Sequence, residues 1–268
     1  QPFPTRPPAY DRQGSTVDDL IDFTPELRAE AEALVQRYRL GPIFTPPILS
    51  QTDGPIATLG LGAGSGGTNW PGGGVDPETG VVFVPSQANF YSWELIPPPD
   101  STTTDMRYVK GTAHRGVGHG GLRDLNVRGL PLARPPYGQL SAIDLRVGEI
   151  VWQVPKGATP DRIANHPMLR DLEIPPTGEL CSGLVGLLVT RTLVISGECD
   201  VHLSDEGTRG AMLRAYDKAT GAEVGAVPMP APQSGSPITY MVDGHQYIVV
   251  AVSGRTYSGE YLAYRLPE

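Results

Sequence analysis

The segment AIDLRVGEIVW, residues 142–152, carries the clearest structural signal in this chain. An apolar run leads into Asp144, a turn closes on Gly148, and a second apolar run ends at Trp152. An Asp side chain can accept backbone N–H groups across such a turn, and glycine supplies the positive φ at its end. The segment therefore predicts two antiparallel strands joined by a tight turn.

The same pattern occurs twice more, in VDPETG (residues 75–80) and in LRAYDKATG (residues 213–221). The three Asp residues, at positions 76, 144 and 217, are spaced by roughly 70 residues, whereas a four-stranded propeller blade needs about 40–50. Long loops between the strands would account for the excess. A fourth and tighter hairpin is expected at the Asp243-Gly244 pair. Repetition favours a β-propeller, and the alternative is a β-sandwich with ordinary Asp-Gly turns.

Short apolar runs between turns supply the other expected strands. They lie at residues 56–59, 81–84, 140–143, 150–154, 192–195 and 247–252. Residues 87–135 and 155–182 are rich in Pro, Gly, Asp and Arg and are expected to be long inserted loops. One helix is expected, capped by Thr24 with Pro25 at its first position and ended by Gly41-Pro42. We therefore expect an extended Pro-rich segment and helix over residues 1–42 and propeller blades over residues 43–268.

Composition excludes several classes of protein. Of the 268 residues, 39% are hydrophobic and 19% are charged, and no run approaches the roughly 20 apolar residues that a membrane helix needs. The 33 Gly and 28 Pro residues favour many short strands over a helical fold. The net charge is −8 and the Lys and Arg residues are scattered, which argues against a nucleic-acid partner.

The two cysteines, Cys181 and Cys199, leave two interpretations open: buried thiols, or a single disulfide if the protein is exported. They fit no metal-binding motif. The chain opens on Gln1 followed by a Pro-rich stretch, without an initiator Met or an apolar leader. This start is expected of a processed product or a fragment. His114 and His119, in a Gly-rich stretch, are interpreted as solvated loop residues rather than metal ligands.

Residues 142–152 resemble the tryptophan-docking motif of quinoprotein propellers, in which the Trp packs between neighbouring blades. Residues 213–221 match the first half of that motif, but Gly225 or Val227 stands where the Trp is expected, so that junction should be less tightly closed. Three further stretches, residues 66–80, 130–138 and 237–250, are similar to sugar and alcohol dehydrogenases that depend on pyrroloquinoline quinone (PQQ). The resemblance implies the C-terminal half of an eight-bladed all-β propeller with four-stranded antiparallel blades.

The resemblance also implies where the cofactor would bind. Asn69 matches the family position whose side chain reaches PQQ, and an amide can donate to a quinone or carboxylate oxygen. Gly67, with Gly66 before it, would let the backbone approach the ring. The cofactor-binding residues expected in this chain are Asn69, Trp70, Gly67, Val185 and Gly186. The alternatives are a turn-capping role for Asn69 and blade packing for Trp70.

The catalytic residues are expected outside this chain. In the family, the catalytic aspartate, the basic residue beside the quinone and the Ca²⁺ ligands come from blades that precede the Asn-Trp loop. Here only 68 residues precede Asn69, and the Asp residues among them (Asp11, Asp18, Asp19 and Asp22) lie in no matching motif. The catalytic residues are therefore unknown, and no metal ligand is assigned although the family implies Ca²⁺ as well as PQQ.

The sequence leads to two readings of function. The first is part of a PQQ-dependent dehydrogenase that oxidises a sugar or alcohol and passes electrons to a quinone or cytochrome, in the periplasm or otherwise exported. The second is a cofactor-free propeller that acts as a binding or scaffold module. In either case the open flanks of a half-propeller expose apolar surface. We therefore expect a partner carrying the missing N-terminal half, or self-association.

Overall fold

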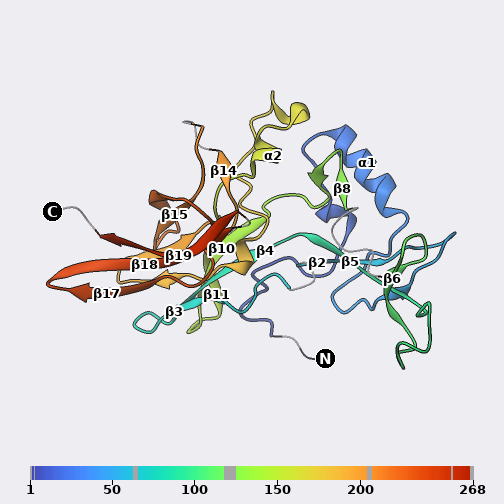
Figure 1. The fold of residues 1–268 in the computed structure, drawn as a ribbon, viewed down its shortest axis with the longest axis horizontal. Coiled ribbons are helices and arrows are strands. Elements are labelled where there is room, and N and C mark those ends of the chain that lie inside the picture. The colour runs from blue at the N-terminus through green and yellow to red at the C-terminus, as the bar shows by residue number, and fades with distance from the viewer. Residues whose placement is uncertain are drawn as a thin grey trace. The chain divides into compact units, whose positions relative to one another are not determined.

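The computed structural model describes residues 2, 4–62, 66–117, 125–203, 207–254 and 256–265 (Figure 1). The chain forms two compact units. Unit 1 comprises residues 1–11, 68–87 and 136–268, and unit 2 comprises residues 12–67 and 88–135. The division expected after residue 42 stays a prediction. Among the described residues, none of the helices combines the length and apolar character that spanning a bilayer requires.

Unit 1 contains three antiparallel sheets. The first consists of β3 (Gly74–Asp76), β4 (Val81–Gln87), β10 (Gly138–Asp144) and β11 (Glu149–Pro155), in that order. The second consists of β12 (Leu188–Val189), β13 (Leu193–Gly197), β15 (Arg209–Asp217) and β16 (Glu223–Met229), with β14 (His202–Leu203) also paired to β15. The third consists of β17 (Ile238–Val242), β18 (His245–Gly254) and β19 (Tyr257–Arg265), three long strands side by side in Figure 1. We call these sheets blades 1, 2 and 3.

The blades pack face to face through two apolar clusters. The cluster between blades 1 and 2 contains Phe83, Leu140, Ala142, Leu187, Val194 and Tyr216. The cluster between blades 2 and 3 contains Ile195, Ala211, Leu213, Met229, Ala231, Val250 and Val252. Successive antiparallel sheets that bury their faces against the next sheet are the building plan of a propeller, so the expected all-β propeller fold is confirmed, although blade 3 has three strands here.

The Asp-turn-Gly segments form as expected. The amide of Gly148 donates to Asp144 O at 2.8 Å, and that of Gly221 donates to Asp217 O at 2.8 Å. Both glycines have positive φ, 69° and 76°, and both Asp side chains accept backbone N–H groups inside the turn. Asp243, with φ of 48°, and the following glycine form the tight hairpin between β17 and β18. The expected strands are all present.

Unit 2 contains the expected helix, which ends at Val35 rather than at Gly41-Pro42, and a sheet of which the sequence predicted only the strand near residues 56–59. Helix α1 (Pro25–Val35) is capped by Thr24, whose hydroxyl accepts the Leu27 amide. The sheet contains β1 (Ile48–Leu49), β2 (Thr58–Leu61), β5 (Phe90–Ile96), β6 (Val109–Thr112) and β7 (Gly116–Val117), and a separate pair is formed by β8 (Asn126–Val127) and β9 (Leu130–Pro131). Residues 87–135 are therefore not one long loop. They return to pair with strands that precede blade 1.

The remaining short helices lie in two places. Unit 2 begins with the 3₁₀-helix η1 (Val17–Asp19), and residues 155–182 of unit 1 are irregular apart from α2 (Asp161–Ala164), η2 (Pro167–Leu169) and the start of η3 (Ser182–Leu184). Asp19 accepts from both the amide and the hydroxyl of Thr16 at 2.9 Å. This Asp therefore caps η1 within its own unit.

Candidate cofactor-lining site

The first strands of blades 1 and 2 lie side by side in unit 1. Gly74 on β3 approaches the following blade so closely that a Cβ placed there would lie 2.6 Å from Leu187 Cδ1 and 2.7 Å from Val189 Cγ2. Any larger residue would push the two strands apart. In a propeller the first strand of each blade lines the central axis, so this is the edge at which an axial ligand would bind.

The Asn69-Trp70 loop enters β3 at this edge and is tied to the segment before β12. The backbone N–H of Asn69 donates to Gly183 O at 3.0 Å. This hydrogen bond joins two segments that are more than 100 residues apart in the sequence. Asn69 Oδ1 accepts the Trp70 amide at 2.8 Å. The side chain of Asn69 therefore does cap the local turn, but it does so through Oδ1 alone. The Nδ2 group makes no hydrogen bond to any residue that the structure describes.

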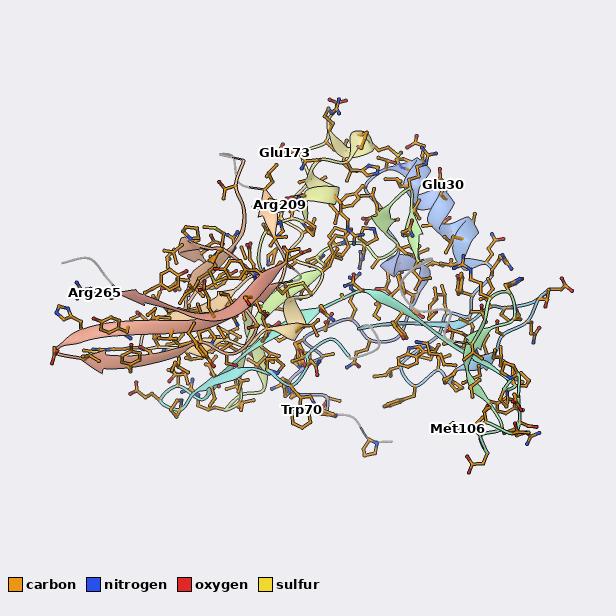
Figure 2. All side chains as sticks on the ribbon, viewed as in Figure 1. Glu30, Trp70, Met106, Glu173, Arg209 and Arg265 are labelled. Atoms are coloured by element: carbon orange, nitrogen blue, oxygen red, sulfur yellow. A yellow bond between two sulfur atoms is a disulfide. The ribbon has the colours of Figure 1, made fainter. Side chains whose placement is uncertain are left out.

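Trp70 projects away from the ribbon of unit 1 (Figure 2). Its side chain is 97% exposed, the largest value among the exposed large hydrophobic residues. Packing within its own blade, the alternative considered for this residue, does not occur in unit 1. The ring instead presents a flat apolar face next to a free amide donor.

The second predicted segment, Val185-Gly186, is held in place by burial and by hydrogen bonds to its backbone. Val185 is buried and its side chain belongs to the core. Gly186 O accepts hydrogen bonds from Ser196 Oγ at 3.0 Å and from Gln233 Nε2 at 2.8 Å. A side chain at Gly186 would collide with Ser236. This segment can therefore contribute backbone to a site, but the valine side chain cannot reach a ligand.

The other residues singled out in the sequence fall in unit 2 or outside the described residues. Gly66 has φ of 85°, and Gly67 lies so close to Gly62 that a Cβ on Gly62 would be 3.0 Å from the Gly67 nitrogen. These glycines therefore shape their own turn. His114 is exposed and lies 3.0 Å from an Arg37 nitrogen, whereas His119 lies outside the described residues.

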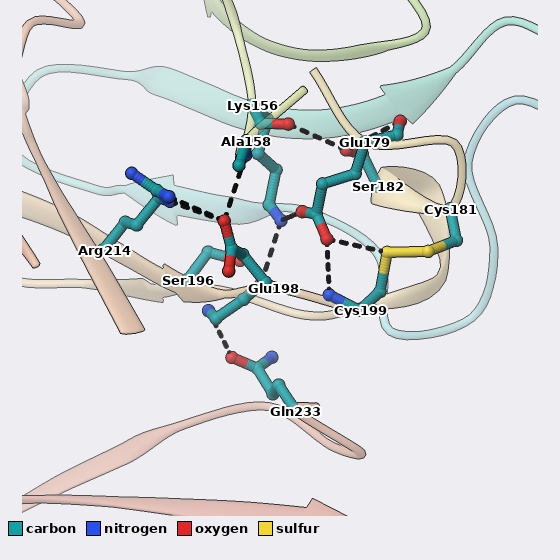
Figure 3. Close-up of polar contacts among 12 residues, drawn as sticks. Lys156, Ala158, Glu179, Cys181, Ser182, Ser196, Glu198, Cys199, Arg214 and Gln233 are labelled. Atoms are coloured by element: carbon teal, nitrogen blue, oxygen red, sulfur yellow. Dashed lines mark hydrogen bonds and ion pairs between the residues drawn. A yellow bond between two sulfur atoms is a disulfide. The ribbon is translucent and has the colours of Figure 1, made fainter. Parts of the chain in front are cut away.

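Sequence reasoning missed a buried ionic cluster next to the two cysteines (Figure 3). Lys156 and Glu179 are 1% and 0% exposed, and Lys156 Nζ donates to Glu179 Oε1 at 3.1 Å and to Gly197 O at 3.0 Å. Glu198, also buried, accepts from Arg214 Nη2 at 2.7 Å. One feature of the sequence could have pointed to this cluster: Glu179 and Glu198 each lie within two residues of a cysteine.

The two cysteines form a disulfide, which settles the choice between thiols and a bridge. Glu179 Oε2 accepts the Cys199 amide at 2.6 Å and lies 3.0 Å from its sulfur. Glu179, Cys181 and Cys199 are close enough to be considered as a metal-ligand set. However, the two sulfurs are bonded to each other and the carboxylate already pairs with Lys156, so the group acts as a cross-link with an ion pair beside it.

Burial raises the pKa of the Glu179 carboxyl above its ordinary value, and the Lys156 ammonium opposes this effect. Burial also raises the pKa of the Tyr216 hydroxyl above its ordinary value. Tyr216 Oη accepts the Gly157 amide at 3.2 Å. The cluster is linked to the segment that holds the Asn69-Trp70 loop, because the hydroxyl of Ser182, next to Gly183, donates to Lys156 O at 3.2 Å.

Trp152 of β11 lies against Gly221 of blade 2 and donates to Lys218 O at 3.2 Å. The blades, this docked Trp152 and the Asn69-Trp70 loop together define a quinoprotein-type propeller segment. A family model described as PQQ: glucose/ethanol/alcohol dehydrogenase, beta-propeller domain, matches residues 1–248. Since that match covers most of the chain, the chain belongs to this family of PQQ-dependent dehydrogenase propellers.

Curated relatives agree with the family assignment. A probable quinate dehydrogenase (quinone) of Xanthomonas campestris pv. juglandis is 30% identical over all of this chain and 34% of its own length. The quinoprotein glucose dehydrogenase of Escherichia coli K12 is 28% identical over 88% of this chain and 29% of its own length. This chain thus spans about a third of the relatives it matches.

One solved structure, a quinohemoprotein alcohol dehydrogenase from Pseudomonas putida HK5, is 23% identical and has a TM-score of 0.47 over 77% of this chain and 25% of that one.

Proposed function

We propose that this chain forms part of the PQQ-binding propeller of a dehydrogenase that oxidises a sugar or an alcohol and passes electrons to a quinone or cytochrome. One observation carries the proposal: the hydrogen bond from the backbone N–H of Asn69 to Gly183 O. It brings together the two segments expected to line the cofactor, at the edge where the first strands of blades 1 and 2 meet. Family membership supports the same conclusion.

The residues present fit part of a PQQ site. The ortho-quinone and three carboxylates of PQQ call for hydrogen-bond donors at the rim and flat apolar faces against the ring. Asn69 Nδ2 would supply a donor, and Trp70 would supply an apolar face. When bound, the quinone would accept the electrons of the substrate. This chain's part is to orient the quinone and shield it from water.

The residues of the site do not include a base, a cation or a calcium ligand. A base must take the proton of the substrate hydroxyl, and cations must balance the PQQ carboxylates. Both, together with Ca²⁺, are assigned in this proposal to a further part of the propeller, either another segment or a partner chain. The coverage of only a third of the relatives supports this assignment.

Blade 3 offers a surface on which that further part would pack. All five residues of β17 are exposed, and the exposed apolar side chains of this blade are Ile238, Tyr240, Met241, Val242 and Tyr261. Because side chains alternate along a strand, Ile238, Tyr240 and Val242 share one face of the sheet, and an exposed apolar face favours a partner or self-association. The disulfide supports export to an oxidising compartment such as the periplasm.

The test is a dye-linked dehydrogenase assay on the natural protein with whatever co-purifies, after addition of PQQ and Ca²⁺. Glucose, quinate, glycerol and 1-butanol are the substrates to compare, since they appear in the names of relatives. Asn69→Ala is expected to weaken PQQ binding roughly 10-fold or more, because a hydrogen bond to a charged group contributes about 1.5–3 kcal/mol. The matched control is Asn165→Ala, an exposed amide at the end of α2.

Dye reduction that requires PQQ and falls with Asn69→Ala but not with Asn165→Ala would support the proposal. Absence of PQQ binding by the assembled protein would contradict it and would favour the cofactor-free binding module.

A further inference from the structure

The helix η3 holds the Asn69-Trp70 loop through a single carbonyl, and it is itself held at both ends. Cys181 at its start is cross-linked to Cys199, and the hydroxyl of Ser182 donates to Lys156 O at 3.2 Å. Beyond its far end, Gly186 O accepts hydrogen bonds from Ser196 of blade 2 and from Gln233 in the connection between blades 2 and 3. Gly183 O, between these anchors, accepts the Asn69 amide.

The anchors at the two ends differ in chemistry. The far anchor consists of hydrogen bonds made by fully buried side chains, Ser196 and Gln233. The near end carries, besides the Ser182 hydrogen bond, a covalent bond between two half-buried cysteines, which a small dithiol can reach. Only this covalent bond can therefore be removed by a change of solution conditions without unfolding the core.

We infer that the Cys181–Cys199 disulfide is a positioning element of the Asn69-Trp70 loop, beside the Thr68 hydroxyl that donates to Pro85 O at 2.8 Å, so that thiol reduction loosens the loop at Asn69 without unfolding the blades. The inference rests on the proposed function only in naming what the loop would bind. A dithiol supplies two electrons and two protons, the S–S bond breaks, both cysteines become thiols, and the reductant closes into its own cyclic disulfide.

The surroundings of Cys199 decide what the reduced state does. Glu179 Oε2, 3.0 Å from the sulfur, would repel a thiolate but can accept an S–H hydrogen bond. Cys199 therefore stays in place as a thiol on the core side, where its amide also bonds Glu179. Among the described residues, Glu179 hydrogen-bonds Cys199 and not Cys181, so we expect η3 and Gly183 O to become more mobile when the S–S bond breaks.

The test is amide hydrogen exchange of the full chain, measured by NMR with the disulfide intact and after reduction with dithiothreitol. The Asn69 amide, bonded to Gly183 O, and the Leu184 amide, bonded to Cys181 O, are expected to exchange at least roughly 10-fold faster in the reduced protein. The Gly80 and Gly148 amides, in turns of blade 1, are the internal controls and should change less than about twofold.

The double substitution Cys181→Ser and Cys199→Ser should reproduce the effect without reductant, and removal of dithiothreitol should reverse it in the native chain. Unchanged exchange at Asn69 would overturn the inference, and so would equal acceleration at all four amides, which would mean a loss of global stability. The measurement needs no PQQ. A failed cofactor titration with accelerated Asn69 exchange would therefore count against the proposed function alone.

Discussion

Blades 1 and 2 pair their last two strands in the same register, but the side chains that pack each of them against the next blade differ. In blade 1, Ala142 pairs with Trp152 just before a β-bulge, and in blade 2, Ala215 pairs with Gly225 just before an equivalent bulge. Gly225 is therefore the structural counterpart of Trp152. The ring of Trp152 lies against Gly221 of the next blade, and its N–H donates to Lys218 O at 3.2 Å. A Cβ on Gly225 would meet nothing within 4 Å.

The two junctions also differ in their hydrogen bonds and ion pairs. Between blades 1 and 2, Lys156 reaches Gly197 O, and Lys218 pairs with Asp76 at 2.8 Å. Between blades 2 and 3, the apolar cluster is supplemented by Gln233, which accepts the Gly197 amide, and by Tyr264, which donates to Pro228 O. Six of the seven residues of β16 are exposed, whereas β11 alternates between exposed and half-buried residues. The second junction therefore lacks a docked ring, and the expectation that it is less tightly closed stays a prediction.

The largest expected effect comes from the buried ion pair of the first junction. Lys156→Met leaves the Glu179 carboxylate buried without its cation, which should lower the free energy of unfolding by about 3–5 kcal/mol. Urea unfolding followed by circular dichroism measures the loss. The double variant Lys156→Met and Glu179→Leu should recover most of it. A single variant as stable as the native chain would show that the pair contributes nothing to the junction.

Loss of the docked ring should be the next largest effect. Trp152→Ala removes a half-buried indole and its hydrogen bond, at an expected cost of about 2–3 kcal/mol in the same unfolding experiment. Trp70→Ala is the matched control, since an exposed ring should change stability by less than about 0.5 kcal/mol. Equal losses in the two variants would contradict the docking role of Trp152.

Installing a ring at the second junction should produce a smaller gain. Gly225→Trp is expected to add about 1 kcal/mol, because it removes a glycine from a strand and covers apolar surface of blade 3. Gly225→Ala separates these contributions, since it removes the glycine but adds no ring. If both variants gain equally, the open position is not a docking site.

The smallest effect concerns the pH dependence of the first junction. The Lys218 ammonium, with the Thr79 hydroxyl, lowers the pKa of Asp76 to about 2. Because the folded-state pKa lies below the ordinary value, the stabilisation is complete above about pH 4 and is lost as the pH falls towards 2. Lys218→Met should therefore reduce thermal stability at pH 7 but have little effect near pH 2. Arg191→Met, an exposed control, should show no such pH-dependent difference.

The sequence predicted the local structure well because strands, turns and the helix cap depend on neighbouring residues. The sequence could not show that the first Asp-turn-Gly segment occupies a different place in its blade from the other two. The turn that begins at Asp76 joins the first two strands of blade 1, whereas those at Asp144 and Asp217 join the last two strands of their blades. Only the spacing between Asp144 and Asp217 is therefore a true blade repeat.

The site was predicted in part for the same reason. The Asn69-Trp70 loop could be found from its resemblance to the family, and its contact with Gly183 follows from the packing of two blades. Lys156 and Glu179 could not be paired from the sequence, since they are distant in the chain and charged residues are usually exposed. The binding roles of the five expected cofactor residues stay predictions.

The most direct test of the central claim, that this chain is a segment of a larger PQQ propeller, is the intact mass and N-terminal sequence of the natural polypeptide together with anything that co-purifies. The account predicts a larger polypeptide, or a companion chain that carries the remaining blades. A monodisperse, cooperatively melting monomer of this chain alone, without a companion, would contradict it.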